Sequence, residues 1–205
     1  AHTNNMAEMG LPGPRTHGYL LERALGGAAM IVCEPVPLHR TGVLTRGNFL
    51  HGSDEVIKPF QRITEDVKAA GSVILQQLYH VGAHGDSDLS FAPHWSPSGG
   101  PSYHDSDGSH RMTETEIEEI IAAHTAAAIR CQKAGFQGVE VWAAYHSLLD
   151  QFWTPWSNTR DDKWGGSLEN RMRYPLEVFE AMRAVWPAGK PMSVRISAHD
   201  WIDGG

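Results

Sequence analysis

The most regular feature of this sequence is a set of short, nearly continuous apolar runs. None of them alternates between apolar and polar positions, and all are rich in β-branched residues, which is the pattern of strands buried on both faces. The pattern therefore predicts four buried strands of a parallel sheet. The runs are AAMIVCE at 28–34, SVILQQLY at 72–79, GVEVWAA at 138–144 and MSVRIS at 192–197.

Helix start and stop signals occupy the segments between these runs. Pro175 falls inside the last expected helix and lacks the amide that would bond to residue 171, so we expect a kink or break there. The expected helices run from Pro14 and Arg15 to Gly26 and Gly27, from Ser53 to Gly71, from a capping box of Thr113 and Glu116 to Gly135, and onward from Ser167.

The alternation of strands and helices predicts an α/β fold, either a doubly wound sheet or a (β/α)8 TIM barrel. No G-x-G-x-x-G or G-x-x-x-x-G-K follows any expected strand, so the phosphate-binding turn of the doubly wound nucleotide folds is missing. Polar and aromatic residues cluster after the strand ends, where barrel enzymes carry their active sites. These observations favour the barrel.

The expected barrel is incomplete. A full barrel takes about 250 residues, whereas this chain has 205, begins with Ala1 and ends in a loop-like Asp-Gly-Gly. With the tail of a further strand expected at residues 1–4, the sequence predicts about five βα units in one domain, residues 1–205, cut from a longer protein. An open sheet exposes two strand edges, so we expect the piece to be unstable, to form homo-oligomers or to aggregate.

Composition restricts the classes of function. The formal net charge is −7, and the charges are scattered rather than gathered in runs. This excludes a basic nucleic-acid surface and a polybasic membrane patch, and no apolar run approaches the roughly twenty residues of a membrane helix. Cys33 and Cys131 lack metal or redox spacing and are expected to be buried thiols of a reducing compartment. We expect a cytoplasmic protein that acts on a small molecule.

One group of histidines has a spacing that could suggest a metal. His80 and His84 are followed by Asp86, but Gly82 and Gly85 deny them a helix face and no further ligand follows at a fixed spacing, so no metal site is predicted. His80 is instead expected to line a ligand pocket or to cap a loop. Three other histidines of the long Gly/Ser/His-rich loop at 82–112 are expected to be exposed: His94, His104 and His110.

Several sequence words occur in an order that resembles the Old Yellow Enzyme family, and within it the branch of 2,4-dienoyl-CoA reductase and trimethylamine dehydrogenase. The resemblance implies a barrel that binds FMN noncovalently at the carboxyl ends of its strands and takes hydride from NAD(P)H. Longer relatives add an iron–sulfur cluster and a second nucleotide domain. The words are HTNNMAEMGLPG, GGAAMIVCEP, QQLYHVG and VRIS, together with LLDQF, SNTRDDKWGG and SLENR between residues 135 and 184.

The resemblance implies roles for individual residues. Gln77 stands where the family has a glutamine that bonds the flavin pyrimidine edge, and Arg195 where an arginine stabilises the negative charge of the reduced ring. Thr3 and Pro35 occupy strand-end positions that touch the flavin, and Thr3 falls where some relatives carry a cysteine, which favours noncovalent FMN. From the residues alone, a salt-bridged arginine and a structural amide stay open as alternatives.

The sequence departs from the family after the third apolar run. Many members place His-x-x-His or His-x-x-Asn there to hold the carbonyl oxygen of an unsaturated substrate, whereas this chain has Trp142 and Tyr145. Both can donate a hydrogen bond, so they are the expected catalytic residues, although simple packing stays open. Ser147 stands where a tyrosine is common, and His146, a further candidate proton donor, replaces a glycine.

The sequence leaves three hypotheses for the function. The first is an FMN-dependent ene-reductase that passes hydride from NAD(P)H to the β-carbon of an activated alkene, with Tyr145 supplying a proton or holding the carbonyl. The second is a flavin-dependent amine dehydrogenase or demethylase, in which Trp142 and Tyr145 surround an alkylated ammonium. The third is a non-catalytic fragment that lacks the loops on which the family binds the FMN phosphate.

Overall fold

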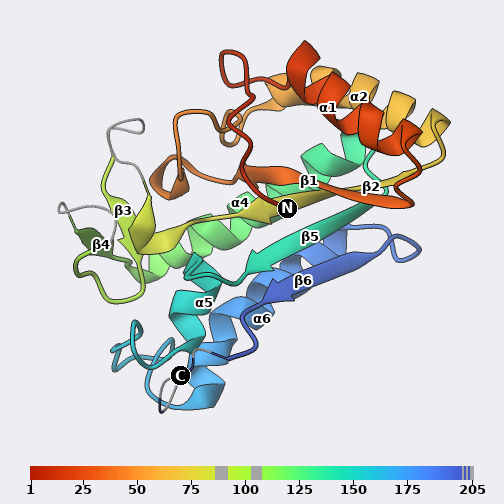
Figure 1. Ribbon diagram of the computed structural model, residues 1–205. Helices are drawn as coiled ribbons and strands as arrows, with labels where there is room; N and C mark the ends of the chain where they lie inside the picture. The colour runs from red at the N-terminus through yellow and green to blue at the C-terminus, as the bar shows by residue number, and fades with distance from the viewer. Residues whose placement is uncertain (86–91, 103–107, 200, 202, 204–205) are drawn as a thin grey trace.

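Four parallel strands form the main sheet of the computed structural model, which describes residues 1–85, 92–102, 108–199, 201 and 203. All neighbours pair in parallel, in the order β1-β2-β5-β6 (Figure 1). This confirms the four predicted strands, with the first displaced toward the C-terminus. The strands are β1 (Met30–Pro37), β2 (Val73–Tyr79), β5 (Gly138–Ala143) and β6 (Met192–Ile196).

The prediction of a further strand at residues 1–4 is wrong. These residues join no sheet. Side chains hold the segment instead: the amide of Asn4 donates to Glu34 Oε2 at 2.7 Å, and the guanidinium of Arg195 donates to the carbonyl of Ala1 at 2.9 Å. The N-terminal segment therefore lies across the sheet rather than extending it.

The helices begin where the capping residues predict. Thr113 and Glu116 form the complete capping box of α4, and Ser167 Oγ accepts from the amide of Asn170 at the start of α6. Ser53 caps a 3-10 turn, Asp54–Val56, that leads directly into α2. The helices are α1 (Pro14–Leu25), α2 (Ile57–Ala69), α4 (Glu114–Lys133), α5 (Leu148–Trp153) and α6 (Leu168–Val185).

Of the kink or break expected at Pro175, the break does not occur. Helix α6 runs from Leu168 to Val185 with Pro175 inside it. Pro175 is buried beside Tyr174, whose ring packs 4.2 Å from that of Phe152 in α5. Packing of this helix face against the rest of the protein offsets the one missing backbone hydrogen bond.

The long loop after β2 contains structure that the sequence pattern did not predict. Strands β3 (His94–Ser96) and β4 (Ser109–Arg111) form a second, parallel pair. Arg160 fastens this pair to the segment after α5, because its Nη1 donates to the carbonyls of Pro97 at 2.6 Å and Met112 at 2.7 Å. Because Arg160 is only 6% exposed, these hydrogen bonds lie in the protein interior.

The helices cover one face of the main sheet. In Figure 1, α4 and α6 run behind the strands and α1 and α2 lie beside β1, while the N-terminus lies on the front face. Successive residues of β5 point to opposite faces of the sheet. Val139, Val141 and Ala143 belong to the main core with the helices, whereas Trp142 belongs to a smaller hydrophobic cluster with Tyr79.

The main core also holds both cysteines, which are free and buried as predicted. Strands β1 and β6 leave the two expected open edges, and on β6 the side chains of Val194 and Ile196 are 42% and 59% exposed. Within the described residues, no helix combines the length and the apolar character needed to cross a lipid bilayer.

Buried histidines make this fold sensitive to acid. His124 in α4 is 1% exposed, and burial lowers its pKa to about 4, although its ring nitrogen bonds the carbonyl of Ile120. Because the unfolded chain binds a proton near pH 6.5 and the folded chain does not, stability is complete above that pH and falls as the pH drops toward 4.

We therefore expect His124→Leu to flatten the acid limb of the stability profile. The native histidine should cost about 2 to 3 kcal/mol of unfolding free energy between pH 7.5 and 4.5, a loss that the variant avoids. Urea unfolding at both pH values measures this, with the exposed His110 changed to leucine as the control. An equally steep loss in the His124 variant would contradict the assignment.

Candidate active site

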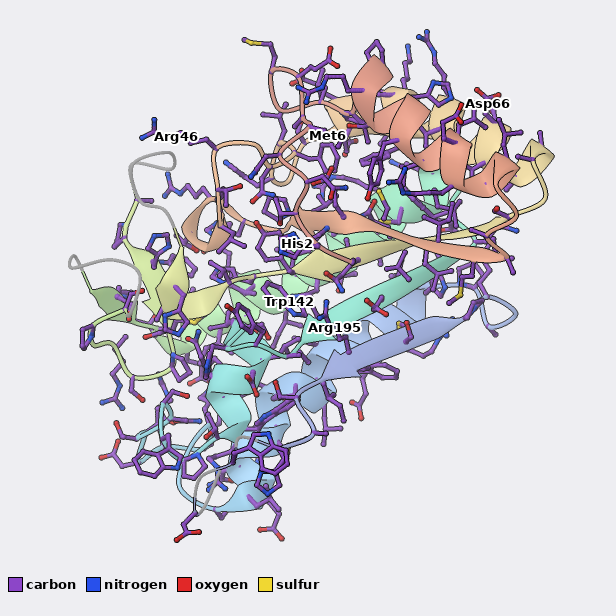
Figure 2. All side chains as sticks on the ribbon, in the orientation of Figure 1. His2, Met6, Arg46, Asp66, Trp142 and Arg195 are labelled. Atoms are coloured by element: carbon purple, nitrogen blue, oxygen red, sulfur yellow. The ribbon has the colours of Figure 1, made fainter. Side chains whose placement is uncertain are left out.

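A cleft of about 340 Å³ opens on the face of the sheet opposite the helices, and all six predicted site residues line it. It lies where barrel enzymes place their active sites, beside the carboxyl ends of β1, β2, β5 and β6. Figure 2 shows Trp142 and Arg195 close together on this face, with His2 beside them. The lining residues are Ala1, His2, Thr3, Pro35, Leu44, Gln77, Trp142, Tyr145 and Arg195.

The strand register explains why residues so far apart in sequence meet here. Gln77 of β2 pairs with Glu140 of β5, and Trp142 of β5 pairs with Arg195 of β6. Since side chains alternate between the two faces of a strand, residues 140 and 142 point to the same side. Register and alternation together place these polar residues on the side away from the helical core.

Gln77 is fixed by its cross-strand partner. The side chain is 1% exposed, and its Nε2 donates to Glu140 Oε1 at 2.5 Å. A carboxylate only accepts, so the amide nitrogen must face Glu140. Gln77 is thus both a structural amide and a lining residue of the cleft.

Glu34, next to Pro35 on β1, is a second carboxylate of the barrel interior. It is 3% exposed, and burial raises its pKa, against the lowering effect of the bond from the Asn4 amide. Its Oε1 is buried without a hydrogen-bond partner among the described residues.

Arg195 supplies positive charge at the rim of the cleft. Its side chain is exposed and donates to the carbonyl of Ala1. In the part of the chain that the structure describes, Arg195 makes no ion pair. The alternative interpretation, that Arg195 is a structural arginine in a salt bridge, therefore has no support among these residues. The guanidinium keeps donors for a ligand.

Trp142 lines the cleft and carries an unsatisfied hydrogen-bond donor. The residue is 7% exposed, and its ring packs edge-to-face on Tyr79 with centroids 5.3 Å apart. Its Nε1 is buried and finds no acceptor among the described residues. Because an unpaired buried N–H is costly, this atom marks a position where a ligand acceptor would stabilise the site.

Tyr145 and His146 form an unusual turn directly after β5. Their φ angles are +53° and +59°, a left-handed conformation that is costly for residues other than glycine. The turn is held at both residues: the amide of Tyr145 donates to Ser197 Oγ at 3.0 Å, and that of His146 donates to Asp150 Oδ2 at 2.8 Å. Tyr145 remains 65% exposed, with its side chain at the cleft.

Ser147 has a structural role. It is fully buried at 0% exposure and caps α5, accepting from the amide of Asp150. It does not line the cleft. The hydroxyl of Ser147 is thus committed to the helix start, whereas the side chain of Tyr145 lines the cleft.

His80 belongs to a hydrogen-bond chain rather than to the cleft lining. Its Nδ1 accepts from the amide of Gly82, so its Nε2 carries the proton toward Thr41 Oγ1 at 3.0 Å. Thr41 Oγ1 in turn lies 2.7 Å from His39 Nδ1. Burial lowers the pKa of His80 well below its ordinary value, which keeps the ring neutral.

The predictions for the other histidines have mixed outcomes. His94 was expected to be exposed, and this is wrong: it is 1% exposed, with its ring over Gly85 and its Nδ1 3.2 Å from the carbonyl of Thr41. His110 is exposed as predicted and pairs with Glu116. Asp86 and His104 lie outside the described residues. Within the described residues, no three or more His, Cys, Asp or Glu side chains form a group that could hold a metal ion.

The sequence did not point to three residues at or behind the cleft. Glu140 contacts the lining residue Gln77, and its place two residues before Trp142 on the same strand face was a usable signal. His2 and Leu44 carried no signal, because loop geometry alone brings them to the cleft. No cysteine lines the cleft, which agrees with the expectation that a flavin here would not be attached through sulfur.

The fold and the cleft define a class: an α/β barrel protein, present here in part, with its ligand site at the carboxyl ends of parallel strands. The chain belongs to the NADH:flavin oxidoreductase / NADH oxidase family, whose sequence pattern matches residues 5–205. This confirms the family indicated by the sequence words. Membership makes FMN the expected flavin and a reduced nicotinamide the expected reductant.

A curated relative agrees with this family assignment. The chain is 38% identical over 184 residues to the NADPH dehydrogenase of Clostridium acetobutylicum, covering 89% of this chain and 53% of that protein. The chain thus spans about half the length of that relative.

Solved structures share the fold. A 2-naphthoyl-CoA reductase in complex with 2-naphthoyl-CoA superposes with a TM-score of 0.93 at 29% identity, over 100% of this chain and 33% of that one. Histamine dehydrogenase from Rhizobium sp. 4-9 superposes with a TM-score of 0.84 at 25% identity, over 91% of this chain and 28% of that one.

The left-handed turn yields a prediction. Replacing His146 by glycine removes the steric cost of φ +59° and should raise the unfolding free energy by about 1 kcal/mol, as measured by urea unfolding. His110→Gly, in strand β4, is the control and should destabilise. If His146→Gly destabilised the protein, the contact between the rings of His146 and His84, whose centroids lie 5.6 Å apart, would outweigh the backbone strain.

Proposed function

We propose that residues 1–205 are the FMN-binding part of an NAD(P)H-dependent ene-reductase, which reduces an alkene conjugated to a carbonyl group. The observation that carries the choice of substrate is Trp142, which lines the cleft and whose buried Nε1 has no acceptor among the described residues. A carbonyl oxygen supplies that acceptor. Family membership supports the flavin and the nicotinamide.

The cleft fits the ring system of a flavin. Its volume of about 340 Å³ lies in the range of small-molecule sites, roughly 300 to 1,000 Å³. Gln77 faces it from the floor and Arg195 from the rim. Barrel enzymes frequently hold a phosphate on the loops after their last two strands, so the residues described here are proposed to hold the ring rather than the phosphate.

Bound FMN supplies the redox chemistry, accepting hydride from NAD(P)H and donating it to the β-carbon of the alkene. Arg195, which lines the cleft, would stabilise the negative charge of the reduced ring with its fixed positive charge. Trp142 Nε1–H donates to the substrate carbonyl, which polarises the alkene and stabilises the charge that develops on oxygen. The Tyr145 phenol lines the same cleft and would deliver the proton that completes the reduction.

Oxidation of an amine is the second candidate function. Two aromatic residues, Trp142 and Tyr145, line the cleft, and such rings attract alkylated ammonium groups. The structural similarity to a histamine dehydrogenase supports this reading. An ammonium group, however, cannot accept from Trp142 Nε1, and for this reason the alkene substrate is preferred.

The flavin assignment predicts a specific effect of Arg195. After incubation with FMN and removal of the excess, the chain should retain a flavin with a shifted absorption band. Arg195→Gln should then lower the two-electron potential of the bound flavin by about 30 mV, the equivalent of about 1.4 kcal/mol. Arg15→Gln, exposed at the start of α1, should leave it unchanged. A chain that retains no flavin would refute the proposal for this segment.

The substrate assignment predicts an effect of Trp142. With FMN, NADPH and a cyclic enone, Trp142→Phe should lower kcat about 100-fold, because it removes one hydrogen-bond donor to the developing oxyanion. Trp156→Phe is the matched control, since Trp156 is 62% exposed and does not line the cleft. Flavin bleaching by an alkylamine without nicotinamide, together with no enone turnover, would favour amine oxidation instead.

A further inference from the structure

Glu140 is a charged residue that contacts the floor of the cleft and that the proposed function leaves without a role. It sits on β5 opposite Gln77 of β2, and its Oε1 accepts from Gln77 Nε2 at 2.5 Å. It does not itself line the cleft. In the part of the chain that the structure describes, it forms no ion pair.

This contact determines which end of the Gln77 amide the cleft presents. The nitrogen and oxygen of a glutamine amide have nearly the same shape, so packing alone does not choose between two orientations. A carboxylate does choose, because it accepts a hydrogen bond from the amide nitrogen and repels the amide oxygen. Glu140 therefore leaves Gln77 Oε1 for the cleft.

The orientation gives the floor of the cleft a defined hydrogen-bond pattern. Two buried polar side chains of the described residues line it: Gln77, whose Oε1 is left as an acceptor, and Trp142, whose Nε1 has no acceptor. A ligand that satisfies Gln77 Oε1 must carry an N–H. The imide N–H of a flavin pyrimidine ring has this property, whereas a ring alkylated at that nitrogen does not.

We propose that Glu140 is a positioning residue that orients the Gln77 amide, so that the cleft selects a ligand edge with an N–H donor. This rests on the proposed function, since it takes the flavin ring as that ligand. Glu140 does not touch the ligand in this proposal. It acts by removing the alternative amide orientation, in which Gln77 would present its N–H groups to an N–H of the ligand.

The test compares FMN with N3-methyl-FMN as ligands of the 205-residue chain, by quenching of flavin fluorescence. The unchanged chain should bind FMN at least ten-fold more tightly than the methylated form. In Glu140→Gln and Glu140→Leu this ratio should fall below three-fold, chiefly through weaker FMN binding. Glu22→Gln, exposed on α1, is the control and should keep the full ratio.

A second readout does not depend on the bulk of the methyl group. With FMN labelled with nitrogen-15 at N3, the N3–H proton should be protected from solvent exchange in the unchanged chain and should exchange rapidly in both Glu140 variants. Circular dichroism identifies folded variants, and the isosteric Glu140→Gln keeps the test valid if the leucine variant does not fold.

The outcomes are distinguishable. FMN binding with the same ratio and the same N3–H protection in the folded Glu140 variants would overturn the role of Glu140 and leave the proposed function standing. A ratio near one in the unchanged chain would do the same. An unchanged chain that binds neither ligand would overturn both the proposed function and the inference.

Discussion

The structure depends on one geometric constraint: four parallel strands in register, each alternating its side chains between two faces. One face must bury apolar side chains against the helices, and it does so with Val139, Val141 and Ala143 of β5. The residues between them are then forced to the other side. This is why Glu140 and Trp142 lie there.

Polar groups on that second face are satisfied by one another before any ligand binds. Glu140 holds Gln77, and Glu34 holds the amide of Asn4, so the N-terminal segment and the sheet share their hydrogen bonds. Exceptions include Trp142 Nε1 and Glu34 Oε1, which lack partners among the described residues. Buried polar groups without a partner are costly, so a bound ligand or water that paired with them would stabilise this side of the sheet.

The turn after β5 shows a second kind of accommodation. Tyr145 and His146 adopt a conformation that glycine would adopt more cheaply, and side chains from two neighbouring elements hold it in place. Ser197 follows β6 and Asp150 belongs to α5, so the turn is fixed by the same strands and helix that border the cleft. Backbone strain and site geometry are thereby linked at one position.

The sequence by itself determined the α/β order, the four strands and the starts of four helices, because apolar runs and capping residues act locally. Its motif words also pointed to six of the residues that line the cleft. Short elements such as β3, β4 and α5 escaped it, since three to six residues carry too little periodic signal. The errors at residues 1–4 and His94, and the expected break at Pro175, have a common cause. Each was judged from local propensity, whereas contacts with distant segments decided the outcome. These contacts are with Glu34 for the N-terminal segment, with α5 for the proline-containing helix and with the backbone of Thr41 for the histidine.

Only the tertiary structure could assign Glu140 its contact with Gln77, because strand register is set by packing across the whole sheet and not by the sequence of either strand alone.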